Sequence, residues 1–317
     1  MAERERINSV PLVSLITINY NQAAVTCQLL ESTRRLKYPR FEVIVVDNAS
    51  KEDPTDRIVK GRYPNVKVVR SSENLGFSGG NNLGMQHARG AYFFFLNNDT
   101  EVTPDLLDQL LEPFKTNPAI GIVCPKIRYF DQPTVIQYAG YFPLSKFTGR
   151  TWSIGLGETD KGQYDRSGVT DFAHGAAMMV SRRAVEIGGA MDESFFLYYE
   201  ELDWSMQIQR AGFQIYYQAA ALIYHKESIS VGKASPMKVY YLTRNRLLFM
   251  RRNVSGFPLY VFILYYFCFA LTKAAFVYAV KGQLTYLNAL KNAIVWHFTH
   301  KIRRSKNNLS SPAVAVT

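Results

Sequence analysis

Carboxylate and amide side chains follow two short apolar runs in the first hundred residues. Asn98 and Asp99 follow the run Tyr92–Leu96, and Asp47 and Asn48 follow an earlier aliphatic run. A carboxylate at the exposed end of a buried strand can hold a divalent cation against a diphosphate, and hard oxygen ligands suit Mg²⁺ or Mn²⁺. It can also accept the imide N–H of a uracil or thymine ring. Since Asn and Asp are common in turns and helix caps, each motif alone also has a purely structural explanation.

A third candidate is the glycine- and asparagine-rich segment from Glu73 to Gly84, which contains Gly76 and Asn81. Its glycines let the backbone approach a ligand closely, and they open a helix whose N-terminal amides can face an anion. The spacing is not the dinucleotide-binding fingerprint, and no phosphate-loop lysine follows. This argues against a nicotinamide-dependent enzyme and against a P-loop NTPase. An ordinary glycine-rich turn is the alternative.

Three carboxylates lie within four positions after an aromatic segment. Glu200, Glu201 and Asp203 follow the run Phe195–Tyr199. Burying these carboxylates without a purpose would be costly, and a carboxylate beside aromatic groups can be tuned as a general base. Acids in the first turn of a helix also complement its macrodipole, so helix capping explains the same pattern.

A histidine, His225, ends the apolar segment that covers residues 219–224. A neutral imidazole there can complete a metal site with Asp99, although an unligated histidine at a strand end is the more common outcome. Because the two residues are far apart in the sequence, only the fold can bring them together.

These residues need a sheet that places several strand ends side by side. Short apolar runs alternate with amphipathic stretches in the first half, a pattern typical of parallel strands joined by helices. The predicted strands are Leu12–Thr17, Glu42–Val46, Val66–Val69, Ala91–Leu96 and Ile120–Pro125, and the predicted helices are Gln22–Leu36, Asp53–Lys60, Gly79–Arg89 and Pro104–Phe114. Ligands bind at the carboxyl ends of such strands, so the polar residues there are expected to form one site.

The second half is predicted to be less regular before it becomes helical. Loops and irregular strands are expected over Asp131–Asp171, followed by regular structure over Met178–Ile187, a helix from Glu200 and two short strands ending at His225. After them we expect a basic helix from Pro236 to Asn253, an apolar run Phe257–Val280, an amphipathic stretch to about His300, and a disordered tail Asn307–Thr317.

Charge divides the chain near residue 230. Residues 228–317 contain no Asp or Glu and 13 Lys and Arg, whereas the preceding part carries 24 basic and 26 acidic residues. Basic residues beside an aromatic and aliphatic run favour an anionic lipid surface over nucleic acid. We expect interfacial helices. A transmembrane span and a soluble helical cap are the alternatives.

Three separated cysteines, Cys27, Cys124 and Cys268, form neither a disulfide framework nor a zinc knuckle, which suits a reducing compartment. No signal peptide is visible in Met1–Ser9. The expected location is therefore the cytoplasmic face of the cell membrane, with peripheral or C-terminal anchoring.

Together, these motifs resemble the inverting family-2 glycosyltransferases, in particular the non-processive branch that includes rhamnosyltransferases. Any one motif is weak, but their order over about residues 10–252 is specific. The segments that carry the resemblance are Thr17-Ile18-Asn19-Tyr20-Asn21, Val46-Asp47-Asn48-Ala49-Ser50, Asn74-Leu75-Gly76-Phe77, Asn97-Asn98-Asp99, Gly188-Gly189-Ala190-Met191-Asp192-Glu193, Tyr199-Glu200-Glu201-Leu202-Asp203-Trp204, and His225.

The resemblance implies a GT-A fold, which is a Rossmann-like, mostly parallel sheet flanked by helices. It implies a catalytic domain over residues 1–235, with a donor-binding half at about 10–125 and an acceptor half at about 126–235. A C-terminal membrane-association segment over 236–317 would follow.

The resemblance also implies roles for individual residues. Asp99 and His225 would hold Mg²⁺ or Mn²⁺, and Glu201 would be the general base, with Asp203 in reserve. The donor, a dTDP-rhamnose or UDP-sugar type of nucleotide-diphosphate-sugar, would contact Thr17, Asn19, Asp47, Asn48, Gly76, Asn81, Asn98 and Glu200. This chain has Glu-Glu where the family usually has Glu-Asp, and Asn-Asn-Asp in place of Asp-x-Asp.

The implied reaction is a single displacement with inversion onto a cell-surface glycan or a lipid-linked saccharide. A nucleotide-binding or nucleotidyltransferase protein without glycosyl transfer is the main alternative. A membrane-associated scaffold would not need Asp99 and Glu201. A nucleic-acid-binding protein would place its aromatic and basic residues on a polar surface rather than beside a lipid-like run.

Overall fold

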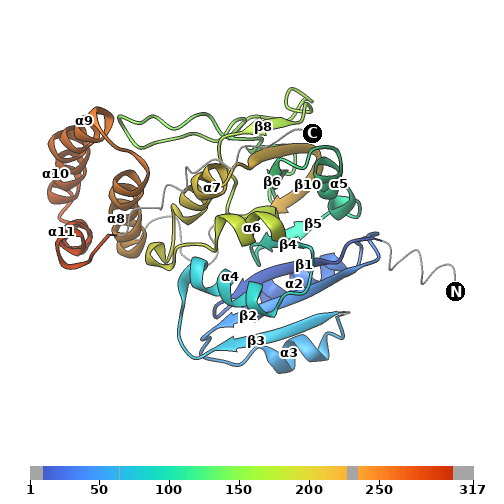
Figure 1. The fold of residues 1–317 in the computed structure, drawn as a ribbon. Helices are drawn as coiled ribbons and strands as arrows, with labels where there is room; N and C mark the ends of the chain where they lie inside the picture. The colour runs from blue at the N-terminus through green and yellow to red at the C-terminus, as the bar shows by residue number, and fades with distance from the viewer. Residues whose placement is uncertain (1–9, 64, 227–234, 303–317) are drawn as a thin grey trace, which may run out of the picture.

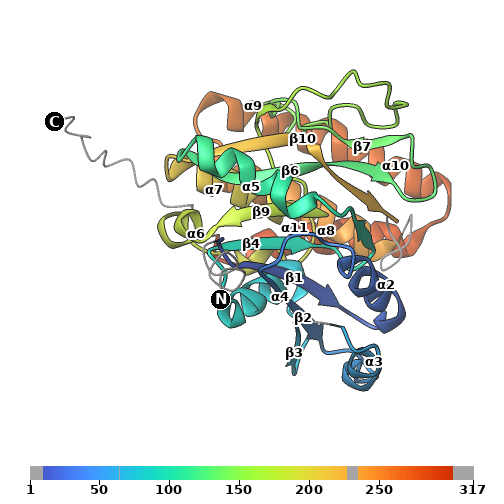
Figure 2. The same ribbon diagram turned by 90° about the vertical axis from the view of Figure 1, so that its right-hand side faces the viewer.

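The computed structural model describes residues 10–63, 65–226 and 235–302 (Figures 1 and 2). Within them the chain forms one ten-stranded sheet. Its strands are β1 (Val13–Asn19), β2 (Phe41–Asn48), β3 (Val66–Ser71), β4 (Tyr92–Leu96), β5 (Thr100–Val102), β6 (Ile120–Tyr129), β7 (Ile136–Tyr138), β8 (Gly168–Thr170), β9 (Ala177–Ser181) and β10 (Gln214–His225).

The sheet has a parallel half and a mixed half. Its strand order is β3-β2-β1-β4-β9-β6-β10-β5, with β7 beside β6 and β8 beside β10. The pairs β3–β2, β2–β1, β1–β4 and β6–β10 are parallel. Strand β9 runs antiparallel to both β4 and β6, and β5 runs antiparallel to β10. The carboxyl ends of β1, β2 and β4 therefore meet at one edge.

The central strands are nearly continuous apolar runs because helices and loops cover both faces of the sheet. In β4, the side chains of Phe93, Phe94, Phe95 and Leu96 are all buried. The helices of this part are α2 (Ala23–Thr33), α3 (Thr55–Lys60), α4 (Gly76–His87), α5 (Leu106–Thr116), α6 (Arg182–Gly188) and α7 (Glu200–Arg210), with a 3₁₀ turn η1 (Glu193–Phe195). Helix α4 packs on β1 and β2, and α5 packs on β6 and β10.

A helical group forms the C-terminal part of the described chain. It consists of α8 (Pro236–Asn253), α9 (Phe257–Tyr265), the π-helical turn η2 (Tyr266–Leu271), α10 (Thr272–Val280) and α11 (Leu284–Thr299). Figures 1 and 2 show these helices together on one side of the sheet. Helix α11 runs along α8, and α8 contacts α7 and η1. A second apolar cluster joins Phe195 and Leu202 to Leu248, Phe249 and other α8 and α9 residues.

The α/β architecture and every helix and strand predicted for the first half are confirmed, with ends shifted by a few residues. The predicted pair of strands before His225 is wrong. The structure has one strand, β10, with irregular register after Gln214 and between Gln218 and Leu222. The predicted disordered tail, 307–317, lies outside the described residues. The boundary near residue 235 stays a prediction.

Candidate active site

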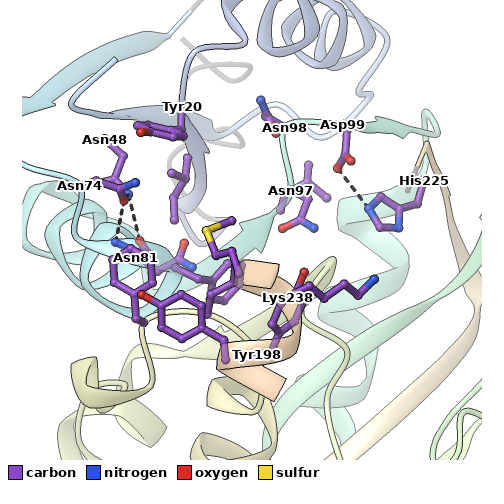
Figure 3. Close-up of a pocket in the computed structure, with 18 of the residues that line it drawn as sticks. Tyr20, Asn48, Asn74, Asn81, Asn97, Asn98, Asp99, Tyr198, His225 and Lys238 are labelled. Carbon is purple, nitrogen blue, oxygen red and sulfur yellow. Dashed lines mark hydrogen bonds and ion pairs between the residues drawn. The ribbon is translucent and has the colours of Figure 1, made fainter. Parts of the chain in front are cut away.

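A cavity of about 580 Å³ opens at the carboxyl ends of β1, β2 and β4. Figure 3 shows Asn48, Asn74 and Asn81 on one side of it and Asp99 with His225 on the other. Polar and aromatic side chains from both halves of the sheet and from α8 surround it. The lining residues are Ile18, Tyr20, Asn48, Asn74, Gly76, Phe77, Asn81, Leu96, Asn97, Asn98, Asp99, Gln137, His174, Phe196, Leu197, Tyr198, His225, Met237, Lys238 and Tyr241.

The twelve site residues predicted from the sequence fall into three groups by their location in the structure. Six line the cavity, namely Asn48, Gly76, Asn81, Asn98, Asp99 and His225. Thr17, Asn19 and Asp47 are buried on β1 and β2 behind the lining residues. The remaining three, Glu200, Glu201 and Asp203, lie in the first turn of α7.

Asp99 and His225 meet although 126 positions separate them. Strand β5 pairs antiparallel with β10, and the register places His225 opposite Thr100. As a result, the Asp99 Oδ1 to His225 Nε2 distance is 3.1 Å, and both side chains are almost completely buried. Gln137 Oε1 lies 2.8 Å from His225 Nδ1 and fixes the orientation of the ring.

This pair suits a cation. Since Gln137 Oε1 can only accept a hydrogen bond, the His225 Nδ1 atom carries a proton. In this tautomer, Nε2 presents a lone pair beside the Asp99 carboxylate, so both groups offer electron pairs to a cation placed between them. No group of three or more His, Cys, Asp or Glu side chains with metal-binding geometry occurs among the residues that the structure describes.

A buried polar network lies behind the cavity wall. The Asp47 carboxylate accepts hydrogen bonds from Asn19 Nδ2 at 2.9 Å and from the Ser50 amide at 3.3 Å, and it pairs with Arg70 at 3.2 Å. These bonds orient the carboxylate at the end of β2. Two other predicted donor-binding groups, Thr17 Oγ1 and Asn81 Nδ2, are buried without a hydrogen-bond partner among the described residues.

An unpartnered buried donor is uncommon in proteins, so Asn81 is of particular interest. Asn81 lies in the first half of α4 and lines the cavity with only 2% of its surface exposed. Its Nδ2 group can donate a hydrogen bond to an acceptor atom placed in the cavity.

The Asn48 carboxamide shapes the loop that precedes α4. It donates from Nδ2 to Asn74 Oδ1 at 2.9 Å and to the Gly76 carbonyl at 3.0 Å, and its Oδ1 accepts from the Leu75 amide. Gly76 has φ of +68°, and a Cβ atom there would lie 2.3 Å from the Phe196 carbonyl oxygen. Only glycine allows this close approach at a positive φ.

Glu201 is not one of the residues that line the cavity. Its side chain passes over Gly175, where an added Cβ would be 3.8 Å from Glu201 Cβ, Cγ and Cδ. The neighbouring residue, His174, lines the cavity. Burial raises the pKa of Glu201 to about 7, although backbone N–H groups at the start of α7 oppose the shift. A carboxyl group with such a pKa can exchange a proton near neutral pH.

Glu200 occupies a more enclosed position than Glu201. It is 5% exposed, and its Oε2 atom has no hydrogen-bond partner among the described residues. Burial, together with the neighbouring Glu201 charge, raises the pKa of Glu200 well above its usual range.

Asp203 faces away from the cavity and toward α8. Its carboxylate pairs with Arg252 Nε at 3.1 Å and accepts a hydrogen bond from Asn253 Nδ2 at 2.6 Å. Burial raises the pKa of Asp203, and the Arg252 guanidinium opposes that shift. This ion pair fastens α7 to α8.

The segment before α7 has an unusual backbone. Phe196, Tyr198 and Tyr199 have φ values of 63°, 70° and 72°, which are costly for aromatic residues. Asn245 of α8 stabilises this shape, because its Nδ2 lies 2.8, 2.7 and 2.8 Å from the carbonyl oxygens of residues 195, 197 and 198. Arg244 Nη2 donates to the carbonyls of residues 194 and 195.

No sequence motif predicted that α8 contributes to the cavity wall. Met237, Lys238 and Tyr241 line the cavity. One signal was present in the sequence: the polar Arg244-Asn245-Arg246 triplet precedes the apolar run 247–250, and all seven residues are buried. Buried polar side chains in a helix need partners from elsewhere in the fold.

The structure also places His174, which precedes Gly175, in the cavity wall. Its ring stacks on Tyr141 with centroids 6.2 Å apart, and its Nδ1 accepts the Ala176 amide hydrogen at 3.1 Å. Burial, with a smaller contribution from His225, lowers the pKa of His174 to about 3. The ring is therefore neutral and carries its proton on Nε2.

The sequence of the chain is similar to that of a known protein family. The sequence profile of the family described as Glycosyl transferase family 2 matches residues 14–188, which is more than half of the chain. The matched segment includes the Asp47, Gly76 and Asp99 motifs and ends before α7.

Two relatives illustrate the range of the similarity. The chain is 28% identical over 261 residues to y4gI of Sinorhizobium fredii, itself uncharacterised, and the match covers 78% of this chain but only 28% of that relative. It is 23% identical over 266 residues to N-acetylglucosaminyl-diphospho-decaprenol L-rhamnosyltransferase of Mycobacterium tuberculosis, with 77% of this chain and 86% of the relative covered.

Among solved structures, the fold is similar to that of mannosyltransferase PcManGT from Pyrobaculum calidifontis in complex with GDP-Man and Mn²⁺. The TM-score is 0.58 at 16% identity, and the match covers 94% of this chain and 93% of PcManGT. This similarity confirms the expected GT-A fold.

Proposed function

Because the chain belongs to glycosyl transferase family 2, we propose that it moves a sugar from a nucleotide-diphosphate-sugar onto a hydroxyl acceptor, with inversion at the anomeric carbon. One observation carries this proposal. A single cavity brings together the Asp99–His225 pair and the amide-lined loop that Asn48 shapes, and Glu201 lies beside Gly175, the residue that follows the cavity-lining His174.

The donor would lie across the carboxyl ends of the strands, as ligands do in open α/β sheets. Asp47, Asn19 and Thr17 at the ends of β1 and β2 would form the base and ribose side, and Asn48, Gly76, Asn81 and Asn98 would line the path to the diphosphate. The Asn81 Nδ2 group, which has no partner in the described protein, supports a polar ligand in that path. A dTDP-rhamnose or UDP-sugar type of donor fits this arrangement.

Asp99 and His225 would hold Mg²⁺ or Mn²⁺ at the diphosphate, since two protein ligands suffice where phosphate oxygens and water complete the coordination. A bound divalent cation supplies positive charge that neutralises the leaving diphosphate. Gln137 would keep the His225 ring oriented for this role.

Glu201 would act as the general base. Its carboxylate removes the proton from the acceptor hydroxyl as that oxygen forms a bond to the anomeric carbon. The bond from this carbon to the diphosphate oxygen breaks on the opposite face, and the nucleoside diphosphate leaves with the electron pair. A pKa near 7 makes Glu201 able to accept the proton at neutral pH, whereas Asp203 is already paired with Arg252.

The acceptor in this proposal is a cell-surface glycan or a lipid-linked saccharide. The mycobacterial relative, whose name specifies a diphospho-decaprenol acceptor, supports a lipid-linked acceptor. The helical run Phe257–Val280 also supports it: this run is 24 residues long, has a mean hydropathy of 1.7, and has 11% of its most apolar window buried.

We further propose that this run lies in the cytoplasmic interface of the membrane. Lys273 interrupts it, Lys281 follows it, and no acidic residue occurs from residue 228 onward. Length and composition alone would also allow a transmembrane span. The surface charge and the apolar run together favour anionic lipid over nucleic acid as the partner.

A donor screen with Mn²⁺ tests the function directly. Nucleotide-diphosphate-sugars are incubated with the protein, and release of the nucleoside diphosphate is measured with and without a saccharide acceptor. Release with one class of donor, dependent on added metal, is expected. Binding of a nucleotide without release or transfer of sugar would favour the nucleotide-binding alternative.

The metal assignment has its own test, the Asp99→Ala variant. Calorimetry should show that Mn²⁺ strengthens binding of a nucleoside diphosphate to the parent protein but not to this variant. Asp56→Ala, on α3 and far from the cavity, is the matched control. If metal strengthens binding equally in Asp99→Ala, Asp99 is not a ligand.

A further inference from the structure

A β-hairpin over residues 141–153 projects from the sheet beside the cavity. Its two arms are joined by antiparallel bridges between Tyr141 and Ser153 and between Ser145 and Arg150. Large apolar side chains on it remain exposed: 49% of Phe147 and 60% of Trp152 are accessible, and Phe142 is exposed beside Trp152. Such exposed aromatic groups commonly mark an interaction surface.

The hairpin tip is fastened to the C-terminal helices. Gly149 has φ of +63°, and a Cβ atom there would lie 2.9 Å from Met250 Cγ and 3.0 Å from Phe262. The Arg246 guanidinium donates to the Thr148 carbonyl oxygen, with Nε at 3.0 Å. In Figure 1 the light-green loop beside α9 is this hairpin. The hairpin and α9 therefore form one rigid edge of the molecule.

The adjoining helix, α9, also exposes apolar groups. Phe257 and Tyr260 are 74% and 73% exposed, and Leu264 is exposed one turn further along the same face. These three residues belong to the run that we assign to the membrane interface.

The positive charge of the hairpin and of the C-terminal helices favours an anionic bilayer over a second copy of the chain as the partner. The hairpin carries Lys146 and Arg150 and no acidic residue, and residues 228–317 also lack acidic residues. A second copy of the chain would bring like charges together across a symmetric contact, which is unfavourable. An anionic bilayer offers both the negative charge that attracts these cations and an apolar layer for the aromatic groups.

We propose that the hairpin is a second membrane-contacting element, and that Phe147 and Trp152 enter the interface of an anionic bilayer together with Phe257, Tyr260 and Leu264. The proposal rests on the membrane association proposed for the C-terminal helices and adds a contact outside them. Two contacts on one rigid edge would set the orientation of the enzyme on the bilayer, which a single interfacial helix would not.

The hairpin connects this edge to the reacting groups. Tyr141, at its base, stacks on His174 of the cavity wall, and the charge of Glu201 contributes, after burial, to raising the pKa of Tyr141. A saccharide carried on a membrane lipid would therefore approach Glu201 from the side that the bilayer covers.

The test uses the full chain and phosphatidylcholine vesicles with or without phosphatidylglycerol. Phe147→Ser/Trp152→Ser should lower the affinity for phosphatidylglycerol vesicles by about tenfold or more in cosedimentation, because two exposed aromatic groups no longer enter the bilayer. Val59→Ser/Ile187→Ser removes two equally exposed aliphatic side chains on α3 and α6 and should have no effect.

A second measurement locates the contact. In a Trp296→Phe background, brominated phosphatidylglycerol should quench the fluorescence of Trp152, while Trp204 is 1% exposed and shielded from the lipid. Unchanged vesicle affinity in the hairpin variant, or fluorescence that bromolipid does not quench, would overturn the proposal. So would a dimer in light scattering that the hairpin variant converts to a monomer, since the partner would then be a second copy.

Release of nucleoside diphosphate from the donor, measured in solution on the same variants, separates this proposal from the enzymatic one. Retained donor turnover with weakened vesicle binding supports the hairpin contact. The parent protein could instead bind vesicles through the hairpin but release no nucleoside diphosphate from any donor. That result would support the hairpin contact and refute the proposed function.

Discussion

The assignment of Glu201 as the general base predicts a specific pH dependence. The base must be ionised to remove the acceptor proton, so transfer should decrease as the pH falls through the pKa of Glu201, which burial raises to about 7. The rate should be nearly constant above about pH 8 and should decrease tenfold for each pH unit well below 7.

The magnitude follows from the fraction of Glu201 that is ionised. With a pKa of about 7, this fraction is about one half at pH 7, about one tenth at pH 6 and about one hundredth at pH 5. A glutamate with an ordinary pKa of about 4.3 would stay mostly ionised at pH 5, and the rate would change less than about twofold between pH 5 and 8.

The assay is initial-rate sugar transfer at saturating donor and acceptor from pH 5 to 9. Glu201→Gln should lower the rate about 10²–10⁴-fold at pH 8, because glutamine cannot take the proton. The decrease in rate between pH 8 and pH 5, the acidic limb of the profile, should be absent in this variant. Glu200→Gln should keep the decrease in rate at low pH whatever its effect on donor affinity, since Glu201 is still present in this variant.

Two results would refute this reasoning. An acidic limb near pH 7 that persists in Glu201→Gln would mean that another group titrates. A parent protein whose rate is constant from pH 5 to 8 would show that Glu201 does not have the raised pKa that its surroundings imply. If the limb moves when Glu200 is replaced, the two carboxyl groups titrate as a pair and neither pKa belongs to Glu201 alone.

Two further predictions concern the backbone around the cavity. Gly76→Ala should lower the free energy of unfolding by about 2–4 kcal/mol, because the new Cβ would strike the Phe196 carbonyl, whereas Gly157→Ala, also at positive φ but with nothing within 4 Å, should lower it by about 1 kcal/mol. Equal losses in denaturant unfolding would rule out the steric contact. Asn245→Ala should lower the free energy of unfolding by about 1–3 kcal/mol and should lower kcat by a larger factor than it changes KM, while Asn292→Ala, on an exposed position of α11, should do neither. Unchanged kcat in Asn245→Ala would show that the carboxamide does not position the α7 segment.

The first half of the fold could be predicted because its signals are local. Strands β1, β2 and β4 are mostly apolar, and polar residues lie at or directly after their carboxyl ends: Asn19, Asn48 and Asn97. The ends of neighbouring parallel strands must lie together, so the cluster of Asn48, Asn98 and Asp99 around one cavity followed from the order of the elements.

The features that could not be predicted depend on contacts between distant segments. The left-handed residues Phe196, Tyr198 and Tyr199 have no local sequence signal, because glycine is the usual residue at positive φ. They are stabilised by Asn245, some fifty positions later, and no pattern in either segment specifies that pairing. The raised pKa of Glu201 likewise depends on tertiary burial.

Helix α8 connects the chemistry to the proposed membrane surface. Its first turns supply Lys238 and Tyr241 to the cavity wall, its middle supplies Asn245 to the segment before Glu201, and its end is joined through Arg252 to Asp203 at the start of α7. The same helix packs against α9 and α11, which expose apolar groups. A force that shifts the C-terminal helices on a bilayer would therefore act on α7, which carries the proposed base Glu201, through buried hydrogen bonds and an ion pair. Close-packed side chains transmit strain. We therefore expect membrane binding to change the rate of sugar transfer as well as the location of the protein.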